Sequence, residues 1–375
     1  MSASLRSSPP PVRVAIVGAG AVSDFHHVPG LALDPRARLV AACDTDELLL
    51  ERRRQEWDLE RITHDPNDLC GDESIDAIII ATPNHTHRPI AVSAAQAGKH
   101  VMCEKPLGLN AAEAREMYHA ARDAGVVHMT AFTYRFAPAM RYLAHLVARG
   151  DLGQPRHFRS QRFLDWPETS WGWRQYRALA GAGDLFDMTI HRIDFALDLL
   201  GPLAHVTGAV AQFAPRTTTT DGQPCPASEV DDWSCLVGQF ASGATGVWEG
   251  TTLAKGYGRG GVGHERAEVN GSEASAVYRL HEPNTILIGR SGEDLAPQTV
   301  PAEFLKPADS PRDPRRGEPA TVFRYDLAWE FVSAIIEGRP AVPSFYDGLR
   351  AQIVADTVLE SYQQRRWMEV ADEPR

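Results

Sequence analysis

Short apolar runs alternate with helix-length amphipathic segments from residue 11 onward, and this alternation constrains the possible folds more than any other feature. The runs read VRVAIVG, RLVAACD, DAIIIAT and HVMCEKP, and VVHMTAF at 126–132 is expected to add one more strand. Parallel strands need crossover connections of about this length. The runs are apolar throughout, as in strands that are buried on both faces. Residues 11–133 are therefore predicted to form a parallel sheet covered by helices, preceded by a disordered tail at 1–10.

Beyond Pro138 the pattern changes to many strand-like runs and few helices. This pattern is typical of an α+β domain built on one open, mostly antiparallel sheet, and we assign residues 134–375 to it. Its last helix is expected to pack back on the first domain. The expected helices are 139–149, 185–200, 321–337 and 346–363. The expected strands are 155–163, 204–213, 231–240, 244–252, 266–280 and 284–289, and 291–319 is predicted to be a long surface loop.

The composition excludes several classes of protein. Of 375 residues, 43% are hydrophobic, which is enough to bury the cores of two domains. The formal net charge of −11 repels phosphate backbones and anionic lipids, so neither nucleic acid nor a membrane is an expected partner. The five cysteines are scattered without a CxxC pair, which favours a reducing compartment. Because we find neither a signal-peptide pattern nor a membrane span, we expect a cytoplasmic protein.

The first apolar run leads directly into a glycine-rich turn, GAGAVS, and a helix-like segment follows. Gly18 permits a tight turn there, and Gly20 lets a pyrophosphate approach backbone N–H groups at the helix N-terminus. Ser23 stands at the usual third glycine or alanine, and its small side chain still permits close packing of helix on strand. The pattern predicts dinucleotide binding, with expected contacts at Gly18, Ala19, Gly20, Ala21 and Val22.

Asp44 ends the second predicted strand, 24 residues after Gly20. A carboxylate there accepts hydrogen bonds from the hydroxyls of the adenosine ribose and repels a 2′-phosphate, so NAD is favoured over NADP. The basic run at 52–54 is placed too far along the next helix to reach that ribose. A second glycine-rich stretch, 256–263, has no helix after it and is interpreted as a hairpin or lid loop.

Three further motifs carry titratable side chains. ATPNHTH at 81–87 and EKP at 104–106 follow the third and fourth apolar runs, where the carboxyl ends of parallel strands face a ligand. Lys105 is accordingly placed near the nicotinamide end of the cofactor. Asp187 and His191 are one helical turn apart in DMTIH, and a carboxylate and an imidazole at this spacing form a plausible catalytic pair.

In this order, the motifs resemble the glucose-fructose oxidoreductase and inositol dehydrogenase (Gfo/Idh/MocA) family over nearly the whole chain. The matching motifs are GAGAVS, CD at 43–44, ATPNHTH, EKP, YRF at 134–136, GAGDLFD at 181–187 and DMTIH. SWGWR at 170–174 and HRIDFA at 191–196 look most like sugar dehydrogenases of the levoglucosan type, whereas DMTIH looks like inositol dehydrogenases. GAGD departs from the three consecutive glycines that are commoner in the family.

The resemblance implies an N-terminal Rossmann domain and a C-terminal open-sheet α+β domain that often makes oligomer contacts. It implies a catalytic triad of Lys105, Asp187 and His191, with Tyr134 as a further substrate contact beside them. The implied substrate is a small neutral sugar or polyol, and the implied assembly is a homodimer or homotetramer. The remaining expected cofactor contacts are Thr82, Pro83, Asn84, His87, Glu104, Lys105, Arg135, Trp173 and Arg174.

Oxidation of a secondary alcohol requires a group that accepts the hydroxyl proton while hydride leaves the carbon. Histidine, with an ordinary pKa of about 6.5, suits this task, so His191 is predicted to be the general base and the rate to rise through one ionisation near neutrality. Lys105 would stabilise negative charge on the same oxygen, and Asp187 would orient the imidazole or bind a neighbouring hydroxyl. The leading hypothesis is an NAD-dependent dehydrogenase acting on a ring hydroxyl of a sugar, anhydrosugar, glycoside or cyclitol.

Two other functions remain open at this point. One is a redox-neutral, NAD-dependent glycosidase or lyase, which would not accumulate NADH as a dehydrogenase does. The other is a non-catalytic dinucleotide or sugar sensor, which would have no need of a proton acceptor and is therefore disfavoured by the intact triad.

Several single residues have alternative interpretations. Asp194 is interpreted as the ion-pair partner of Arg192 or of a nearby group. His85 and His87 resemble a metal-binding pair, but no acidic or cysteine partner is close in sequence, so no metal is expected. Three aromatic residues fit either a hydrophobic core or a sugar-binding surface: Trp171, Trp173 and Tyr176.

Overall fold

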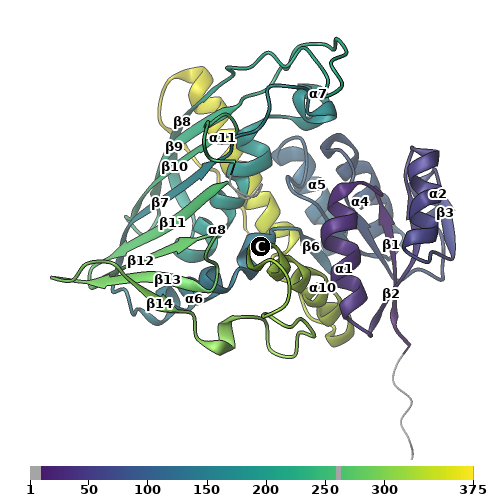
Figure 1. Ribbon diagram of the computed structural model, residues 1–375, viewed down its shortest axis with the longest axis horizontal. Coiled ribbons are helices and arrows are strands. Elements are labelled where there is room, and N and C mark those ends of the chain that lie inside the picture. Colours follow the sequence, from purple (N-terminus) through teal and green to yellow (C-terminus); the bar gives the residue numbers. More distant parts are fainter. Residues whose placement is uncertain (1–9, 259–262, 375) are drawn as a thin grey trace, which may run out of the picture.

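The structure is a computed structural model that describes residues 10–258 and 263–374, and these residues form two sheets (Figure 1). The first is a six-stranded parallel sheet of order β3-β2-β1-β4-β5-β6. Its strands are β1 (Val12–Val17), β2 (Ala37–Cys43), β3 (Arg61–Thr63), β4 (Ala77–Ile80), β5 (His100–Cys103) and β6 (His128–Thr130). Parallel pairing throughout confirms the predicted Rossmann sheet. The predicted tail, apart from Pro10, and residues 259–262 of the predicted lid loop lie outside the described residues.

Both faces of this sheet are buried because side chains alternate along each strand. Val17 and Ile80 pack with α4 and α5, whereas Ile16 and Ile79 on the other face join a core that continues into the second half of the chain. The side chains of polar residues at the N-termini of α2, α3 and α5 accept hydrogen bonds from backbone N–H groups, which fixes where these helices begin. The helices are α1 (Val28–Leu33), α2 (Glu47–Glu56), α3 (Pro66–Cys70), α4 (His87–Gln96) and α5 (Ala111–Asp123).

The second sheet has nine strands in the order β14-β13-β12-β11-β7-β10-β9-β8-β15. Only the β7–β10 pair is parallel among the described strands of this sheet, so the predicted mostly antiparallel sheet is confirmed. Buried and more exposed residues alternate along β7 and β9, as in a sheet with one face on the core. The strands are β7 (Pro155–Phe163), β8 (Leu203–Ala211), β9 (Trp233–Phe240), β10 (Thr245–Thr251), β11 (His264–Gly271), β12 (Ala274–Arg279), β13 (Thr285–Arg290), β14 (Ala296–Thr299) and β15 (Met368–Glu369).

Helices from the end of the chain connect the two sheets. Helix α11 begins at a capping box formed by Ser344 and Asp347 and packs on α5 and β6 of the first sheet as well as on β8 of the second. Helix α10 lies against α1, as Figure 1 shows. None of the described helices is long and apolar enough to cross a membrane. The helices that follow the first sheet in the chain are α6 (Pro138–Arg149), α7 (Arg177–Ala180), α8 (Ile190–Leu200), α9 (Pro319–Val322), α10 (Asp326–Glu337) and α11 (Phe345–Gln364).

Three predicted elements are divided in the structure. The strand expected at 266–280 is the hairpin β11–β12, which turns at the polar residues Ser272 and Glu273. The helix expected at 185–200 begins with a π-helical turn at Leu185–Thr189. The helix expected at 321–337 consists of the end of α9, a 3₁₀ turn at Phe323–Tyr325 and α10.

The prediction of a surface loop at 291–319 is wrong in part. Strand β14 pairs with β13 at the sheet edge, where Pro297 is tolerated because an edge strand need not donate every N–H. Further on, the buried guanidinium of Arg312 lies 2.7 Å from the carboxylate of Asp326 at the start of α10. A buried ion pair therefore fixes a segment whose prolines and charges indicated only exposure.

His128 connects β6 to α11 and should make the fold sensitive to acid. Its ring stacks on Phe345 with centroids 5.2 Å apart, and its Nδ1 accepts a hydrogen bond from the Phe345 N–H. Burial lowers the pKa of His128 to about 4. Because an unfolded histidine has a pKa of about 6.5, the unfolded state binds more protons below that pH. The contribution of His128 to stability is therefore complete above about pH 6.5 and is lost as the pH falls towards 4.

We expect this one residue to lower the free energy of unfolding by about 2 kcal/mol at pH 5 relative to pH 8. Replacement by asparagine, whose side chain does not titrate, should remove that part of the pH dependence. Parallel urea titrations of the wild type and His128→Asn at pH 5 and pH 8 measure the free energy of unfolding of each protein at each pH. The same change with pH in both proteins would contradict the assignment.

Candidate active site

A cavity of about 1000 Å³ lies at the carboxyl ends of the central strands of the parallel sheet, where open α/β sheets bind ligands. It brings together most of the site residues predicted from the sequence. From the first half of the chain it is lined by Gly18, Gly20, Ala21, Val22, Asp44, Thr82, Pro83, Asn84, His85, Glu104 and Lys105, among others. From the second half it is lined by Tyr134, Trp166, Trp171, Trp173, Arg174, Asp187, Met188, His191 and Arg324, among others.

The glycine turn after β1 lies in this lining. Gly18 has a φ of +99°, and a Cβ there would lie 2.5 Å from the carbonyl oxygen of Ala81, so the turn requires glycine. A Cβ on Gly20 would meet no protein atom within 4 Å, so this glycine leaves backbone open to a ligand. Ser23 is fully buried and donates a 2.6 Å hydrogen bond from Oγ to the carbonyl oxygen of Gly18. The serine at the third position thus stabilises the turn.

Asp44 lies beside the turn in the cavity lining. Its Oδ2 accepts a 2.7 Å hydrogen bond from the Ala19 N–H, and its Oδ1 accepts one of 3.0 Å from the Asp46 N–H. Ala19, an expected cofactor contact, is fully buried outside the lining, and its N–H positions the carboxylate instead. Arg53 of the basic run lies outside the cavity lining, where its Nε donates to the Ala19 carbonyl oxygen at 3.4 Å and its Nη1 lies 2.9 Å from the carboxylate of Asp24.

His87, another expected cofactor contact, lies outside the cavity lining. Its ring is fully buried, and its two nitrogens lie 2.9 Å from the carbonyl oxygens of Thr82 and Pro106. The ring thus lies between the ends of β4 and β5, so the role of His87 is to support the cavity wall. Asn84 lies in the lining and donates from Nδ2 to the carbonyl oxygen of Ala180 at 2.9 Å, which links the two halves of the chain.

Lys105 and Asp187 form an ion pair in the cavity. Lys105 Nζ lies 2.7 Å from Oδ1 of Asp187 and also donates to the Asp187 carbonyl oxygen at 2.6 Å. Arg174 approaches the other carboxylate oxygen, with Nε 3.9 Å from Oδ2. Burial raises the pKa of Asp187, but Lys105 and then Arg174 outweigh burial and hold that pKa below its ordinary value. The carboxylate is therefore ionised at neutral pH and fixes the position of the ammonium.

His191 lies in the same lining, held mainly by aromatic rings. Its imidazole packs edge to face on Tyr134, with ring centroids 4.7 Å apart, and on Phe132 at 5.7 Å. Its Nδ1 is buried and has no hydrogen-bond partner among the described residues. The orienting hydrogen bond considered for Asp187 is thus not made to this nitrogen.

The electrostatic environment keeps His191 neutral. Burial, followed by the charges of Lys105 and Arg192, lowers the pKa of His191 well below its ordinary value of 6.5. The imidazole is therefore a competent proton acceptor at pH 7. The expectation of an ionisation near neutrality is corrected by this environment, because the sequence does not show which positive charges surround the ring.

The second glycine of the GAGD sequence has a clear structural reason. Asp231, just before β9, accepts hydrogen bonds from the N–H groups of Gly183 at 2.8 Å and Leu185 at 2.9 Å. A Cβ on Gly183 would lie 1.9 Å from the carbonyl oxygen of Asp231. Glycine is required at position 183, and the two hydrogen bonds fix the turn that leads to Asp187.

Arg135, the third expected cofactor contact outside the lining, is engaged by three carboxylates. Its guanidinium lies 2.5 Å from Asp194, 2.9 Å from Asp198 and 3.1 Å from Asp347. These ion pairs connect α8 with α11 and draw the side chain away from the cavity. Asp194 is therefore an ion-pair partner as interpreted, but of Arg135.

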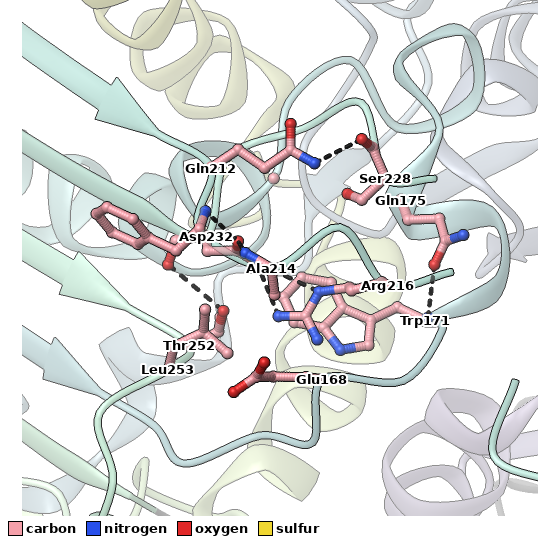
Figure 2. A network of polar contacts seen from close by, with 12 residues as sticks. Glu168, Trp171, Gln175, Gln212, Ala214, Arg216, Ser228, Asp232, Thr252 and Leu253 are labelled. Atoms are coloured by element: carbon pink, nitrogen blue, oxygen red, sulfur yellow. Dashed lines mark hydrogen bonds and ion pairs between the residues drawn. The ribbon is translucent and has the colours of Figure 1, made fainter. Parts of the chain in front are cut away.

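Aromatic side chains form one wall of the cavity. Trp166 and Trp171 meet edge to face with centroids 4.9 Å apart, and Trp173 also lines the cavity, whereas Tyr176 does not. Figure 2 shows the guanidinium of Arg216 against the indole of Trp171, and its Cζ lies 3.6 Å from the ring centroid. Arg216 is buried and pairs with Asp232 at 2.7 Å, so a rigid ionic network supports the tryptophan wall.

Several lining residues were not predicted from the sequence. His26 follows Val22 by one turn of helix, and Met188 lies inside the DMTIH motif, so proximity to known motifs could have indicated both. Arg324 carries no local signal, because it reaches the cavity from a segment 190 residues after its neighbour Tyr134. The other unpredicted lining residues include Thr45, His64 and Trp166. Among the described residues, no group of three or more His, Cys, Asp or Glu side chains could hold a metal ion.

Comparison with known proteins agrees with this arrangement. The model of the oxidoreductase family with an NAD-binding Rossmann fold matches residues 12–132, and that of the GFO/IDH/MocA C-terminal domain matches residues 140–277. Levoglucosan dehydrogenase of Pseudarthrobacter phenanthrenivorans is 29% identical over 96% of this chain and 98% of its own. Myo-inositol 2-dehydrogenase of Thermotoga maritima is 29% identical over 75% of this chain and 80% of its own.

The solved structure of levoglucosan dehydrogenase in complex with NADH and levoglucosan has a TM-score of 0.88 at 28% identity. It covers 96% of this chain and 100% of its own. The two family models together span the whole of the first sheet, strands β7–β11 of the second, and Lys105, Asp187 and His191. The chain belongs to the Gfo/Idh/MocA family of oxidoreductases.

Proposed function

We propose that this protein is an NAD-dependent dehydrogenase that oxidises a ring hydroxyl of a sugar, a sugar derivative or a cyclitol. The observation that carries the proposal is the Lys105–Asp187 ion pair and the neutral imidazole of His191 in one cavity with the glycine turn. A positioned cation and a free proton acceptor are what alcohol oxidation requires. Relatives named as levoglucosan and inositol dehydrogenases support this substrate class.

The cavity fits a nicotinamide dinucleotide at its glycine end. The open backbone at Gly20 and the turn at Gly18 suit a pyrophosphate, and Asp44 has lone pairs left for ribose hydroxyls. When bound, the nicotinamide supplies the hydride acceptor. The other residues that would hold the cofactor are Ala21, Val22, Thr82, Pro83, Asn84, Glu104, Lys105, Trp173 and Arg174.

The remaining chemistry falls to three side chains. His191 would accept the hydroxyl proton, since its imidazole is neutral at pH 7. Lys105 donates two hydrogen bonds to Asp187 and keeps a third N–H for the substrate oxygen, where negative charge develops. Asp187 would hold that ammonium in place, and Tyr134 would contact the substrate from beside His191.

A test of the function is a panel of sugars, glycosides, anhydrosugars and cyclitols, assayed with NAD for the absorbance of the reduced cofactor. Stoichiometric NADH with at least one member is the expected result. Consumption of a glycoside without NADH accumulation would instead establish a redox-neutral lyase or glycosidase. Binding without turnover of any member would contradict the dehydrogenase proposal.

Asp44 should determine the choice of dinucleotide. Its carboxylate can bind ribose hydroxyls and repels a 2′-phosphate, so kcat/KM with NAD should exceed that with NADP by at least about tenfold, or roughly 1.4 kcal/mol. Asp44→Ser should bring the ratio close to one. Asp46→Ser is the matched control, because serine still caps α2 and position 46 is outside the cavity lining. Equal use of both cofactors by the wild type would refute the assignment.

We also propose that the protein works in the cytoplasm as a homo-oligomer. Five free cysteines suit a reducing compartment. The outward face of the nine-stranded sheet, with Arg159 and Val237 exposed, offers a broad surface for a second copy. Light scattering after size exclusion would measure the assembly, and a monomer at micromolar concentration would contradict it.

A further inference from the structure

Arg324 presents a positive charge in the cavity without a carboxylate partner. Three Lys or Arg side chains of the described residues line the cavity. Lys105 and Arg174 both face Asp187, whereas no carboxylate oxygen of the described residues lies within 4.0 Å of the Arg324 guanidinium nitrogens. Its side chain makes hydrogen bonds only to neutral groups, and its Nε is buried without a partner. The charge of Arg324 is thus uncompensated within the described protein.

The neighbours of Arg324 cannot neutralise it. Its Nη1 lies 3.2 Å from Nε2 of His26, and its Nη2 donates to the hydroxyl of Tyr134 at 3.3 Å. Burial and then the charge of Arg324 lower the pKa of His26 to about 4, so that ring is uncharged at neutral pH. Glu265, a buried carboxylate that acts on Tyr134, is already paired with Arg192, and Glu104 of the cavity lining is paired with His27.

The position of Arg324 relates it to the reacting end of the substrate. Tyr134 contacts both residues: its hydroxyl bonds Arg324, and its ring packs on His191 with centroids 4.7 Å apart. The guanidinium Cζ also lies 5.1 Å from the Tyr134 ring centroid. The side chain of Tyr134 thus lies between Arg324 and His191, and a molecule whose hydroxyl reaches His191 lies close to Arg324. Arg324 also contacts His26, which lies one turn of helix after Val22, so a measurement of NADH binding is needed to separate a substrate contact from a cofactor contact.

We propose that Arg324 recognises a carboxylate on the substrate, so that the enzyme acts on a sugar acid or an acidic cyclitol in preference to its neutral counterpart. This inference rests on the proposed dehydrogenase function. It departs from the neutral substrate expected from the sequence. A partly buried charge is costly when unpaired, and a substrate carboxylate would accept charge-assisted hydrogen bonds from the guanidinium. One unpaired cation matches one negative charge, which favours a carboxylate over a doubly charged phosphate.

The experiment compares matched substrates that differ only in charge. Methyl β-D-glucuronide and methyl β-D-glucoside form one pair, the corresponding galacto compounds form another, and methyl β-D-glucoside 6-phosphate is the phosphate arm. We expect kcat/KM with NAD to be at least tenfold higher for an acid than for its neutral partner. Arg324→Gln should reduce that ratio at least tenfold, and Arg324→Lys should preserve part of it. Arg315→Gln removes an exposed charge outside the cavity and should leave the ratio unchanged.

Each other outcome has a definite meaning. A preference for the neutral member, or a ratio that survives in Arg324→Gln, overturns the inference while the dehydrogenase function stands. A preference for the phosphate likewise overturns the assignment of a carboxylate. If Arg324→Gln weakens NADH binding but leaves the acid-to-neutral ratio of kcat/KM unchanged, Arg324 is assigned to the cofactor. If no compound is oxidised, the proposed function fails. Titration of each compound into the NADH-bound protein, followed by tryptophan fluorescence, still tests whether acids bind better than their neutral partners.

Discussion

Replacing His191 by asparagine should lower kcat by about 10²–10⁴-fold, the range expected when an acid–base group is lost. In the wild type, kcat/KM should rise with pH through an ionisation well below 6.5, because burial and the charges of Lys105 and Arg192 favour the neutral imidazole. Only the neutral ring can accept a proton, so activity is lost as the pH falls through that depressed pKa. The pH profile of His191→Asn should lack this acid limb, the loss of activity at low pH. Initial rates of NADH formation between pH 4.5 and 9 measure both effects.

His205→Asn is the matched control, because His205 is exposed on β8 and lies outside the cavity. It should retain the wild-type rate and pH profile. An unchanged acid limb in His191→Asn would transfer the role of base to Lys105. A limb centred near pH 7 in the wild type would contradict the electrostatic description of the pocket.

Replacing Lys105 by methionine should lower kcat by about 10²–10³-fold, as when a preorganised donor to a developing oxyanion is removed. Methionine keeps much of the length of the side chain but removes the ammonium that bonds Asp187. NADH affinity should change by no more than about threefold, because the proposed contacts to the adenosine half, the glycine turn and Asp44, lie on other elements. Steady-state rates and fluorescence titration with NADH separate the two effects.

Lys306→Met tests for a general effect of losing a lysine, because Lys306 bonds the Ser310 carbonyl oxygen outside the cavity. It should be close to wild type in both measurements. Parallel loss of NADH binding and turnover in Lys105→Met would make Lys105 a cofactor anchor. Full activity in that variant would remove Lys105 from the chemistry altogether.

The local pattern of the chain determined the first sheet and the glycine end of the cavity. Continuous apolar runs separated by helical segments can satisfy their backbone only as parallel strands with crossovers, and every predicted strand of that sheet is present. The carboxyl ends of such strands share one edge, so Asp44 and Lys105 could be placed near the cofactor without coordinates. The sequence could also locate Asp187 and His191, since their spacing is that of one helical turn.

Spacing alone could not tell which side chains turn away from the cavity. Arg135 lies next to Tyr134 in the chain, yet carboxylates of α8 and α11 draw it out of the lining. His87 follows the ATPNHT segment, but carbonyl oxygens of two strand ends hold its ring in the core. These partners come from different elements, and a sequence pattern does not show which of them a polar group will meet.

The tertiary structure alone decided the charge environment of the site. Arg324 is 298 residues from His26 and 190 from Tyr134, and it meets both only because the chain returns to α1 after strand β14 of the second sheet. The depressed pKa of His191 depends on cations from separate elements. Hydrophobic periodicity acts over a few residues and can be read directly from the chain. Electrostatic fields sum over distance in space, so they are defined only once the fold has brought the charges together.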